Sequence, residues 1–501
     1  MQTFLDPRDT LCAIFEGIDG NNTIMAILLL ICTLLLCSNI SAQQPISFEE
    51  AVSIMLENNK SITSTRHSIE AARLEQRAAE GLRWPHIDIH GGYLYLQKDI
   101  EVMLGGAKGA VTESVERLIN GGISTGIITP DAASLIDNAL SPLLGADWGY
   151  TLQKQSLGGI SATLEMPIYA GGRINIANRV AKLETEATNI TLEALEGELI
   201  VTLVERYFGV VLAEALYDVE VEAMQSVERH LHDAKALYDE GMVPRSVVLY
   251  VEYKLSEARR SVTAAENRVT MSHLALKSLL GIDYEIKPIV KLFVYNNIYN
   301  INYFIDNAHH LNPIIREANI GKQLANEGVK LARAALLPEV VALGAASIYN
   351  YQLSNLAPRW AVGIGINLTI FDGLGKERRY MAAKVNEAAV NDMVESAKSD
   401  ISLLVEKEYF ELINAKQNIE SSRYSITFAE EYYNSIYEGF VEGIASSSDI
   451  IDASVELSAT KVKYLNAAYD YCISLVKLLN ASGIAYTFVN YLNNGESVDI
   501  N

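Results

Sequence analysis

Four stretches of the chain alternate apolar residues with polar or small ones at every second position. They run from 87 to 95, from 160 to 168, from 341 to 349 and from 362 to 370. A period of two predicts β-strands. In the third stretch we expect one apolar face made of Val341, Leu343, Ala345 and Tyr349. Each stretch is about ten residues long, which suits a strand that crosses a membrane and also an ordinary half-buried strand.

Aromatic residues gather near the ends of these strands. Trp84 and Trp360 stand at strand starts, and the tyrosines near strand ends are Tyr93, Tyr95, Tyr169, Tyr349 and Tyr351. This placement is typical of the aromatic girdles at membrane interfaces. Four strands cannot close a barrel, and an open sheet edge in lipid would leave backbone groups unpaired. We therefore expect other subunits to complete the sheet.

Long helices are predicted for most of the remaining chain. No proline interrupts the stretch between Gly172 and Gly241, where a continuous helix would reach roughly 100 Å. Apolar residues recur there at every seventh position, at Val180, Ala187, Ala194, Val201, Phe208 and Ala215. This spacing predicts a coiled-coil seam. Unbroken helices are also expected from about 376 to 437 and from 448 to 481, since no proline follows Pro358.

The chain contains two copies of one unit. Met166 corresponds to Leu368, an offset of 368 − 166 = 202. Upstream, Pro85 corresponds to Pro338, an offset of 338 − 85 = 253, so the first copy holds 253 − 202 = 51 additional residues. We place these residues in an inserted segment at 97–155, because an exposed loop tolerates insertion best.

Each copy has the order helix, strand, loop, strand, long helix, tight turn, long helix. We expect an N-terminal extension and signal peptide at 1–42, a first repeat at 43–283, a linker at 284–311, a second repeat at 312–483 and a tail at 484–501. Glycines and the helix-start signal Thr129-Pro130-Asp131 in the inserted segment predict a loop with short helices.

The N-terminal region has the features of an export signal. An apolar run at 24–36 is too short to span a membrane and is typical of a signal-peptide core. We expect cleavage after Ala42. The preceding residues are acidic where a signal is normally basic, which favours Met25 as the true start. A bulky residue before Cys37 argues against lipid attachment, so Cys472 would be the single cysteine of the mature chain and no disulfide is expected.

Composition narrows the partners and the chemistry. A net charge of −22 argues against nucleic acid and anionic membrane surfaces as partners. No catalytic constellation is present: His86 and His90 share a strand face but lie about 13 Å apart, too far to ligate one ion. The chain is therefore predicted not to be an enzyme, and no metal or cofactor is expected.

The helix hairpins complete a recognisable pattern. Gly443 is followed six residues later by Asp449, and the mature chain opens on Ile46-Ser-Phe-Glu-Glu-Ala-Val with Glu57-Asn58-Asn59 shortly after. Together with the double repeat, these features resemble the TolC-like outer membrane efflux proteins over nearly the whole mature chain. The first hairpin departs from the pattern, with Val247 in place of an acid.

The resemblance implies a mixed α and β fold, mainly α. Three chains would form a homotrimer. Each chain would contribute four strands to one twelve-stranded β-barrel, which a long α-helical barrel would continue through the periplasm. The linker and tail would form an equatorial belt. The implied function is a passive exit duct in the outer membrane of a Gram-negative bacterium, in contact with its lipid. An inner-membrane pump would drive export through a periplasmic adaptor protein.

A second interpretation is a soluble periplasmic coiled-coil adaptor or scaffold, which would also have long helical hairpins. An adaptor should have one hairpin and lipoyl-like strands, whereas this chain has a duplicated unit and four strands with a membrane pattern.

The hairpin tips carry the candidate functional residues. A charged ring at the periplasmic opening would select cations over anions, and the candidates for such a gate are Asp239, Glu240, Arg245, Glu438, Glu442, Asp449 and Asp452. A solvated helix end is the simpler interpretation of the same carboxylates. The resemblance places adaptor contacts at the two tips, at Gly241, Met242, Val243, Gly443, Ile444 and Ala445.

Overall fold

The computed structural model describes residues 44–354 and 358–498. The predicted signal peptide, its cleavage after Ala42 and the alternative start at Met25 lie outside the described residues. Within them the chain forms two compact units. The first contains 44–71, 185–322 and 390–498, and the second contains 72–184 and 323–389 without 355–357.

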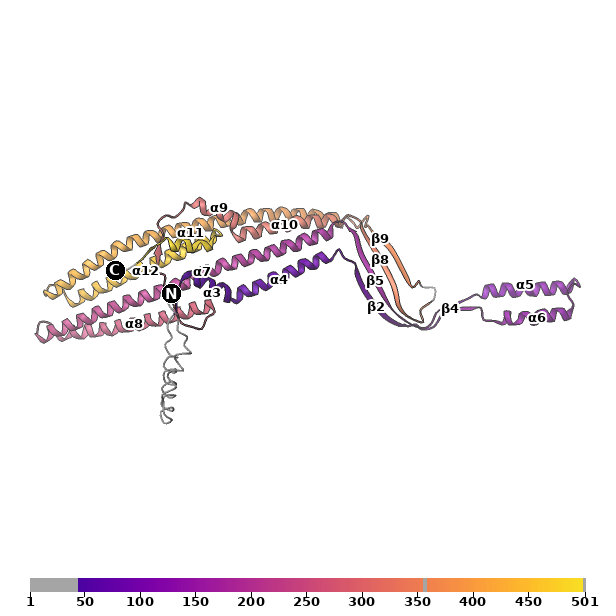
Figure 1. Ribbon diagram of the computed structural model, residues 1–501, viewed down its shortest axis with the longest axis horizontal. Helices are drawn as coiled ribbons and strands as arrows, with labels where there is room; N and C mark the ends of the chain where they lie inside the picture. The colour runs from indigo at the N-terminus through magenta and orange to yellow at the C-terminus, as the bar shows by residue number, and fades with distance from the viewer. Residues whose placement is uncertain (1–43, 355–357, 499–501) are drawn as a thin grey trace, which may run out of the picture. The chain divides into compact units, whose positions relative to one another are not determined.

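The first unit is built around two long helical hairpins. Helix α7 (Arg173–Asp239) is followed by α8 (Arg245–Leu280), and α11 (Gly375–Val441) by α12 (Ser447–Ala481). The two helices of each hairpin lie side by side (Figure 1). These bounds confirm the predicted helices and the two tight turns, where Gly241 and Gly443 both have positive φ. A glycine adopts this left-handed conformation without the strain that a Cβ causes.

Shorter elements lie wholly or partly in the first unit. They are β1 (Gln44–Ile46), α3 (Phe48–Asn58), α4 (Lys60–Gly81), β6 (Ile286–Pro288), β7 (Phe293–Val294), α9 (Ile301–Leu311), α10 (Pro313–Ala334), η1 (Ala485–Thr487), α13 (Phe488–Asn493) and β10 (Glu496–Ser497). Strand β1 pairs in parallel with β6, and β7 pairs antiparallel with β10. Helices α4, α7, α10 and α11 contribute residues to both units.

A cluster of aromatic rings forms the centre of the first unit. Phe48, Tyr207, Phe208, Phe293 and Phe488 are buried, and their neighbouring ring centroids lie 5.2–6.2 Å apart. Such pairs stabilise a core beyond their buried area. One of these rings is that of Phe48, the first residue of α3, in the segment that resembles the family's first helix. A capping box between Ser47 and Glu50 fixes the start of this helix. The predicted linker and tail thus pack onto the helical hairpin.

The turn after α12 should tolerate substitution less than its counterpart in the first repeat. Gly281 and Gly483 end α8 and α12 with φ of +65° and +74°. A Cβ on Gly483 would lie 2.5 Å from the carbonyl carbon of Leu311, whereas a Cβ on Gly281 would lie 3.3 Å from the Asn58 Cβ.

Both Gly→Ala changes introduce left-handed strain of roughly 1–2 kcal/mol, and Gly483→Ala adds a clash with backbone. Melting of the detergent-purified protein should therefore occur at a lower temperature in Gly483→Ala than in Gly281→Ala. Equal melting temperatures would contradict the packing described here.

The second unit contains the predicted four-stranded sheet. Its strands are β2 (His86–Tyr95), β5 (Ser156–Ala170), β8 (Glu339–Tyr351) and β9 (Trp360–Asn367), antiparallel in the order β2-β5-β8-β9. Figure 1 shows them side by side. The last strand ends at Asn367, so the prediction that it continues to Ile370 is wrong. Leu368 and Ile370 lie outside the ladder.

The predicted face of β8 is also wrong. Ile160 of β5 pairs with Tyr349 and the next residue, Ser161, pairs with Ser347, so Ile348 is an extra residue in β8. Because this bulge reverses the alternation of side chains, Val341 and the alternate residues after it lie on one face and Tyr349 lies on the other. A strict period of two cannot reveal such a bulge.

One face of the corrected sheet is apolar. Paired positions place Ile87 beside Leu164, and Gly344 between Leu164 and Val362. The large apolar residues of this face are exposed, and they include Ile87, Ile89, Leu164, Met166, Val362, Ile364 and Ile366. A contiguous exposed apolar surface indicates contact with a partner or with lipid.

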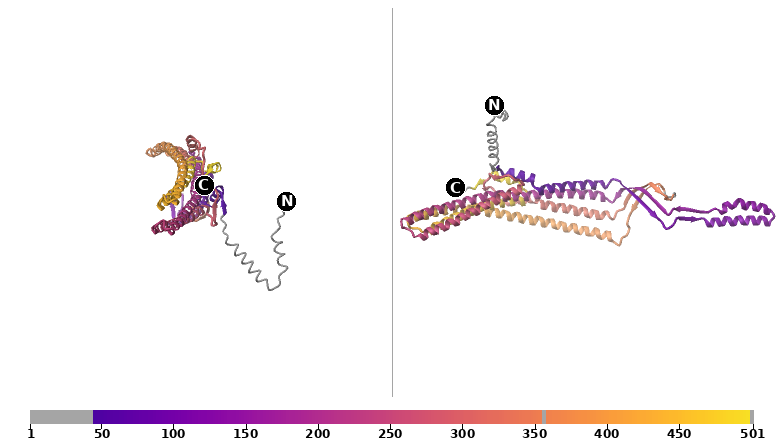
Figure 2. Two further views of the ribbon diagram at one scale, coloured as in Figure 1. Left: turned by 90° about the vertical axis from the view of Figure 1, so that its left-hand side faces the viewer. Right: turned by 90° about the horizontal axis from the view of Figure 1, so that it is seen from below.

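The inserted segment is a helical hairpin on a two-stranded ribbon. Strands β3 (Ile100–Met103) and β4 (Gly149–Gln153) pair antiparallel and lead into α5 (Gly105–Ser124) and α6 (Pro130–Gly145). The helices lie side by side (Figure 2). The predicted helix start is confirmed, since the Thr129 side chain caps α6. Through residues 44–354 and 358–498, no helix combines the length and the hydropathy needed to cross a membrane.

Candidate functional site

The predicted gate residues lie at the ends of the two hairpins. Asp239 and Glu240 follow α7, and Arg245 begins α8. The gate candidates of the second hairpin are Glu438, Glu442, Asp449 and Asp452. All seven are exposed. In the described part of the chain no ion pair joins Arg245 to these carboxylates, so each tip of a single chain presents free negative charge to solvent.

Asp449 also has a local structural role. Its carboxylate accepts hydrogen bonds from the backbone N–H of Ser446 (2.8 Å) and from the Ser446 hydroxyl (2.8 Å), while its own N–H donates to that hydroxyl (3.3 Å). These bonds hold the pKa of Asp449 below its ordinary value. The arrangement is a capping box at the start of α12. Val247 occupies the equivalent position of α8, which has no side-chain cap, and this explains the unequal tips.

Three side-chain contacts that sequence reasoning missed join α7 to the second hairpin. The Ser226 and Tyr433 hydroxyls share a hydrogen bond, and the Tyr437 hydroxyl donates to Asp233 at 3.2 Å. Between them His230 Nε2 lies 2.6 Å from the Ser447 hydroxyl. The α7 members are four and three residues apart and so share one helix face. Polar residues recurring at that spacing are the sequence signal that could have indicated these contacts.

The middle contact is the most buried. The His230 side chain is only 1% exposed and packs edge-on against Phe440, with ring centroids 4.7 Å apart. Burial, opposed by the nearby Asp233, lowers the pKa of His230, so the neutral imidazole is favoured. Burial and Asp233 raise the pKa of Tyr437. The three contacts are therefore polar interactions that join α7 to the second hairpin near its tip, within otherwise apolar packing.

The predicted adaptor-contact residues lie at the turns themselves. Met242 and Ile444 are exposed apolar side chains, each directly after a left-handed glycine, Gly241 or Gly443. Val243 and Ala445 are half-buried. Each tip thus exposes one apolar side chain, although the N-termini of α8 and α12 are capped differently.

A groove of about 530 Å³ runs between α7, α8 and α12 above the tips. Its lining includes the small side chains Ala223, Ala258, Ser261, Ser454, Ser458 and Ala459, the apolar side chains Val227, Ile451, Val455 and Val462, and the charged residues Glu220, Lys254, Glu257 and Lys463. Small residues permit close approach of another helix, and charges of both signs in the lining can orient it.

Comparison with known proteins shows the same arrangement elsewhere. Residues 304–484 match the family described as outer membrane efflux protein. The outer membrane protein TolC of Escherichia coli is 21% identical over 399 residues, which cover 73% of this chain and 80% of TolC. The chain belongs to the TolC-like outer membrane efflux protein family.

Two solved structures show the fold of this TolC-like protein. The crystal structure of CusC matches with a TM-score of 0.68 at 14% identity, covering 87% of this chain and 92% of CusC. The Campylobacter jejuni CmeC outer membrane channel matches with a TM-score of 0.64 at 16% identity, covering 89% of each chain. The predicted fold class is confirmed: mainly helical with strands, as in TolC-type channels, which are trimers with a β-barrel and an α-helical tunnel.

Membership also decides between the two functional interpretations. The TolC-like protein is an outer-membrane efflux channel of a Gram-negative bacterium, and the channel prediction is confirmed over the soluble adaptor. It is a non-enzymatic transporter. Among the described residues no group of three or more His, Cys, Asp or Glu side chains is arranged to hold a metal ion.

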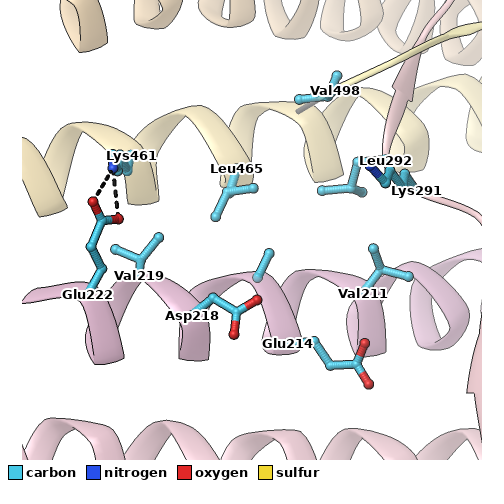
Figure 3. Close-up of a pocket in the computed structure, with 11 residues that line it drawn as sticks. Val211, Glu214, Asp218, Val219, Glu222, Lys291, Leu292, Lys461, Leu465 and Val498 are labelled. Atoms are coloured by element: carbon cyan, nitrogen blue, oxygen red, sulfur yellow. Dashed lines mark hydrogen bonds and ion pairs between the residues drawn. The ribbon is translucent and has the colours of Figure 1, made fainter. Parts of the chain in front are cut away.

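A second cavity of the TolC-like channel, of about 460 Å³, lies between α7, α12 and the linker (Figure 3). Glu214, Asp218 and Glu222 line one side, and Lys291 and Lys461 line the other. The buried Lys461 Nζ lies 2.9 and 2.8 Å from the two carboxylate oxygens of Glu222. Since a buried ammonium without a partner is costly, this pair fixes α12 against α7. The ion pair therefore joins the two hairpins beside this cavity.

Proposed function

We propose that three copies of this chain form one passive exit duct, which an inner-membrane pump drives through a periplasmic adaptor. The four-stranded sheet is the observation that carries the proposal. Within the described residues β2 and β9 each have one unpaired edge, and the exposed apolar face extends across the sheet between them. Joining the edges of three sheets gives twelve strands, satisfies the backbone and turns the apolar face toward lipid.

The long hairpins supply the periplasmic part of the duct. Helices α7 and α11 each have 67 residues, and at about 1.5 Å per residue each extends for roughly 100 Å. Such a length suits a tunnel across the periplasm. The proposed gate lies at its tip, where the exposed carboxylates of three chains repel one another and attract cations, and where the Ser226, His230 and Asp233 contacts hold α7 to the second hairpin.

The adaptor is proposed to reach the tips and the groove between α8 and α12. A helix of the adaptor would lie against the small side chains of the groove, while Met242 and Ile444 would contact the adaptor's end. Both surfaces belong to the first unit and face solvent in the single chain. This mode of docking, a helix lying in a groove, needs small residues in the groove more than specific hydrogen bonds.

Neutral side chains at the tip should weaken cation selection. Glu442→Gln with Asp452→Asn removes two exposed charges per chain, six per trimer, without touching the Asp449 cap. We expect the reversal potential in a bilayer under a salt gradient to move toward zero, since the field that favours cations is smaller. Glu57→Gln, an exposed change in α3 far from the tips in sequence, is the control. A reversal potential equal to that of the unmodified protein would contradict the proposed ring.

Dependence on a pump is tested in cells. Deletion of the gene should raise susceptibility to a panel of toxic compounds or abolish secretion of particular proteins, and re-expression of the chain should restore both. The pattern of lost resistance identifies the cargo, because a wide duct selects through its pump. An unchanged panel and an unchanged set of secreted proteins would contradict the proposed export role.

A further inference from the structure

The inserted hairpin of α5 and α6 lacks a core of its own. No residue of α5 is buried, and Ala133 is the only buried residue of α6. Val115, Ile119 and Leu140 are only half-buried. Helices of 20 and 16 residues are marginally stable in water without tertiary packing. The hairpin therefore needs more burial than a single chain supplies.

Exposed apolar side chains on the outside of the hairpin would become buried on contact with a partner. Leu118 is 73% exposed, Leu135 is 71% exposed and Leu143 is 55% exposed. Val111 lies seven residues before Leu118, and Leu143 lies eight after Leu135, so each helix has one outward apolar row. Glu116 and Asp137, two residues from the central leucines, lie on the opposite sides and are also exposed. Each helix thus has an apolar face without a partner and a polar face toward solvent.

The base of the hairpin is fixed to the sheet. The ribbon of β3 and β4 continues the pairing of β2 with β5, through Tyr95 opposite Ser156 and then Ile100 opposite Gln153. The Gln153 side-chain amide donates to the Gln352 carbonyl at 2.6 Å and accepts from the Ser354 N–H at 2.8 Å. These bonds join the ribbon to the segment after β8. The ribbon at the base of the hairpin is therefore bonded to the sheet.

The occupant of the apolar faces can be argued from this position and from the assembly. The inserted segment joins the ends of β2 and β5 that are remote from the long helices, so in the proposed trimer it lies at the external mouth of the duct. Three fixed bases around one axis bring three identical hairpins together there. Each hairpin at 105–145 has a charge of only 2 − 4 = −2, from Lys108 and Arg117 against Glu113, Glu116, Asp131 and Asp137. Repulsion between copies is therefore weak when these polar faces point outward.

We propose that the α5–α6 hairpins of the three chains pack on one another through these apolar faces and form a six-helix ring, here called the cap, around the external mouth. The partner of each hairpin is the same hairpin of another copy, with α5 of one chain against α6 of the next. A three-fold axis makes such head-to-tail contacts close into a ring. The cap rests on the proposed function, because it requires the trimer. It adds a structure at the outer mouth of the duct.

Cysteine cross-linking in purified trimers tests the cap. Leu118→Cys with Leu135→Cys places one thiol on each apolar row, and Glu116→Cys with Asp137→Cys places thiols at matched heights on the polar faces. After oxidation and denaturation, the first pair should give covalent dimers and trimers, severalfold more than the second pair. Val111→Cys with Leu143→Cys repeats the test if the first pair impairs assembly. The native Cys472 is buried and does not interfere.

The size of each variant in mild detergent separates the two proposals. If the variants are trimeric before oxidation but the apolar-face pairs then cross-link no better than the polar-face pair, the cap is overturned and the proposed duct is not. An unmodified protein that is not trimeric would overturn both. Covalent oligomers from the apolar faces of intact trimers support the cap.

Discussion

Phenylalanine at both Tyr433 and Tyr437 is expected to raise the single-channel conductance of the protein in a planar bilayer. Each change removes a hydroxyl that joins α11 to α7, one bonded to Ser226 and the other to Asp233. Hydrogen bonds of this kind contribute about 1 kcal/mol each. Loss of two therefore favours the open tip by about 2 kcal/mol per chain, or roughly thirtyfold in the opening equilibrium.

Tyr424→Phe provides the matched control for this change. Tyr424 lies on the same helix, is 81% exposed and loses no hydrogen bond that the structure shows. Its conductance should equal that of the unmodified protein. Trimers of the double variant with unmodified conductance would show that these contacts do not hold the tip closed.

Tryptophan at Ala258 and Ser458 is expected to abolish export in cells while leaving the purified channel active. Both residues line the groove between α8 and α12, and an indole there would occupy the space proposed for an adaptor helix. Cells with this variant should be as susceptible to toxic compounds as cells without the gene. Because docking into a groove depends on close packing, two large side chains should remove it entirely.

Leu274→Trp is the control for the groove, since Leu274 is exposed on α8 and does not line the cavity. That variant should keep resistance. Trimer formation and bilayer conductance must be unmodified in both variants, so that a folding defect is distinguished from lost docking. Full resistance in the groove variant would contradict the proposed adaptor site.

The regular parts of the fold could be predicted because they follow local patterns. The absence of proline predicted the bounds of α7 to within a few residues, and the alternation of apolar positions predicted all four strands of the sheet. The extra residue Ile348 could not be found in this way, because a bulge changes which side chains share a face without changing the local composition. The segment interpreted as an insertion was predicted to hold short helices, whereas its two helices have 20 and 16 residues.

The candidate site could be predicted only in part. The tips and their carboxylates follow from glycines and charges along the sequence, and their exposure agrees with a solvent-facing position. The contacts of Ser226, His230 and Asp233 join residues more than 200 positions apart. Such pairs depend on how the second hairpin packs against the first, which no local pattern contains. Asp449 was predicted from the sequence as a gate residue, and the structure shows that it also caps its own helix.

A recording of single-channel current from the purified, unmodified chain in a planar bilayer tests the central claim most directly. The account predicts discrete current steps of uniform size, with more current from cations than from anions, because three acidic chains line one continuous duct. Protein that adds to the bilayer without producing steps, or steps that favour anions, would contradict it.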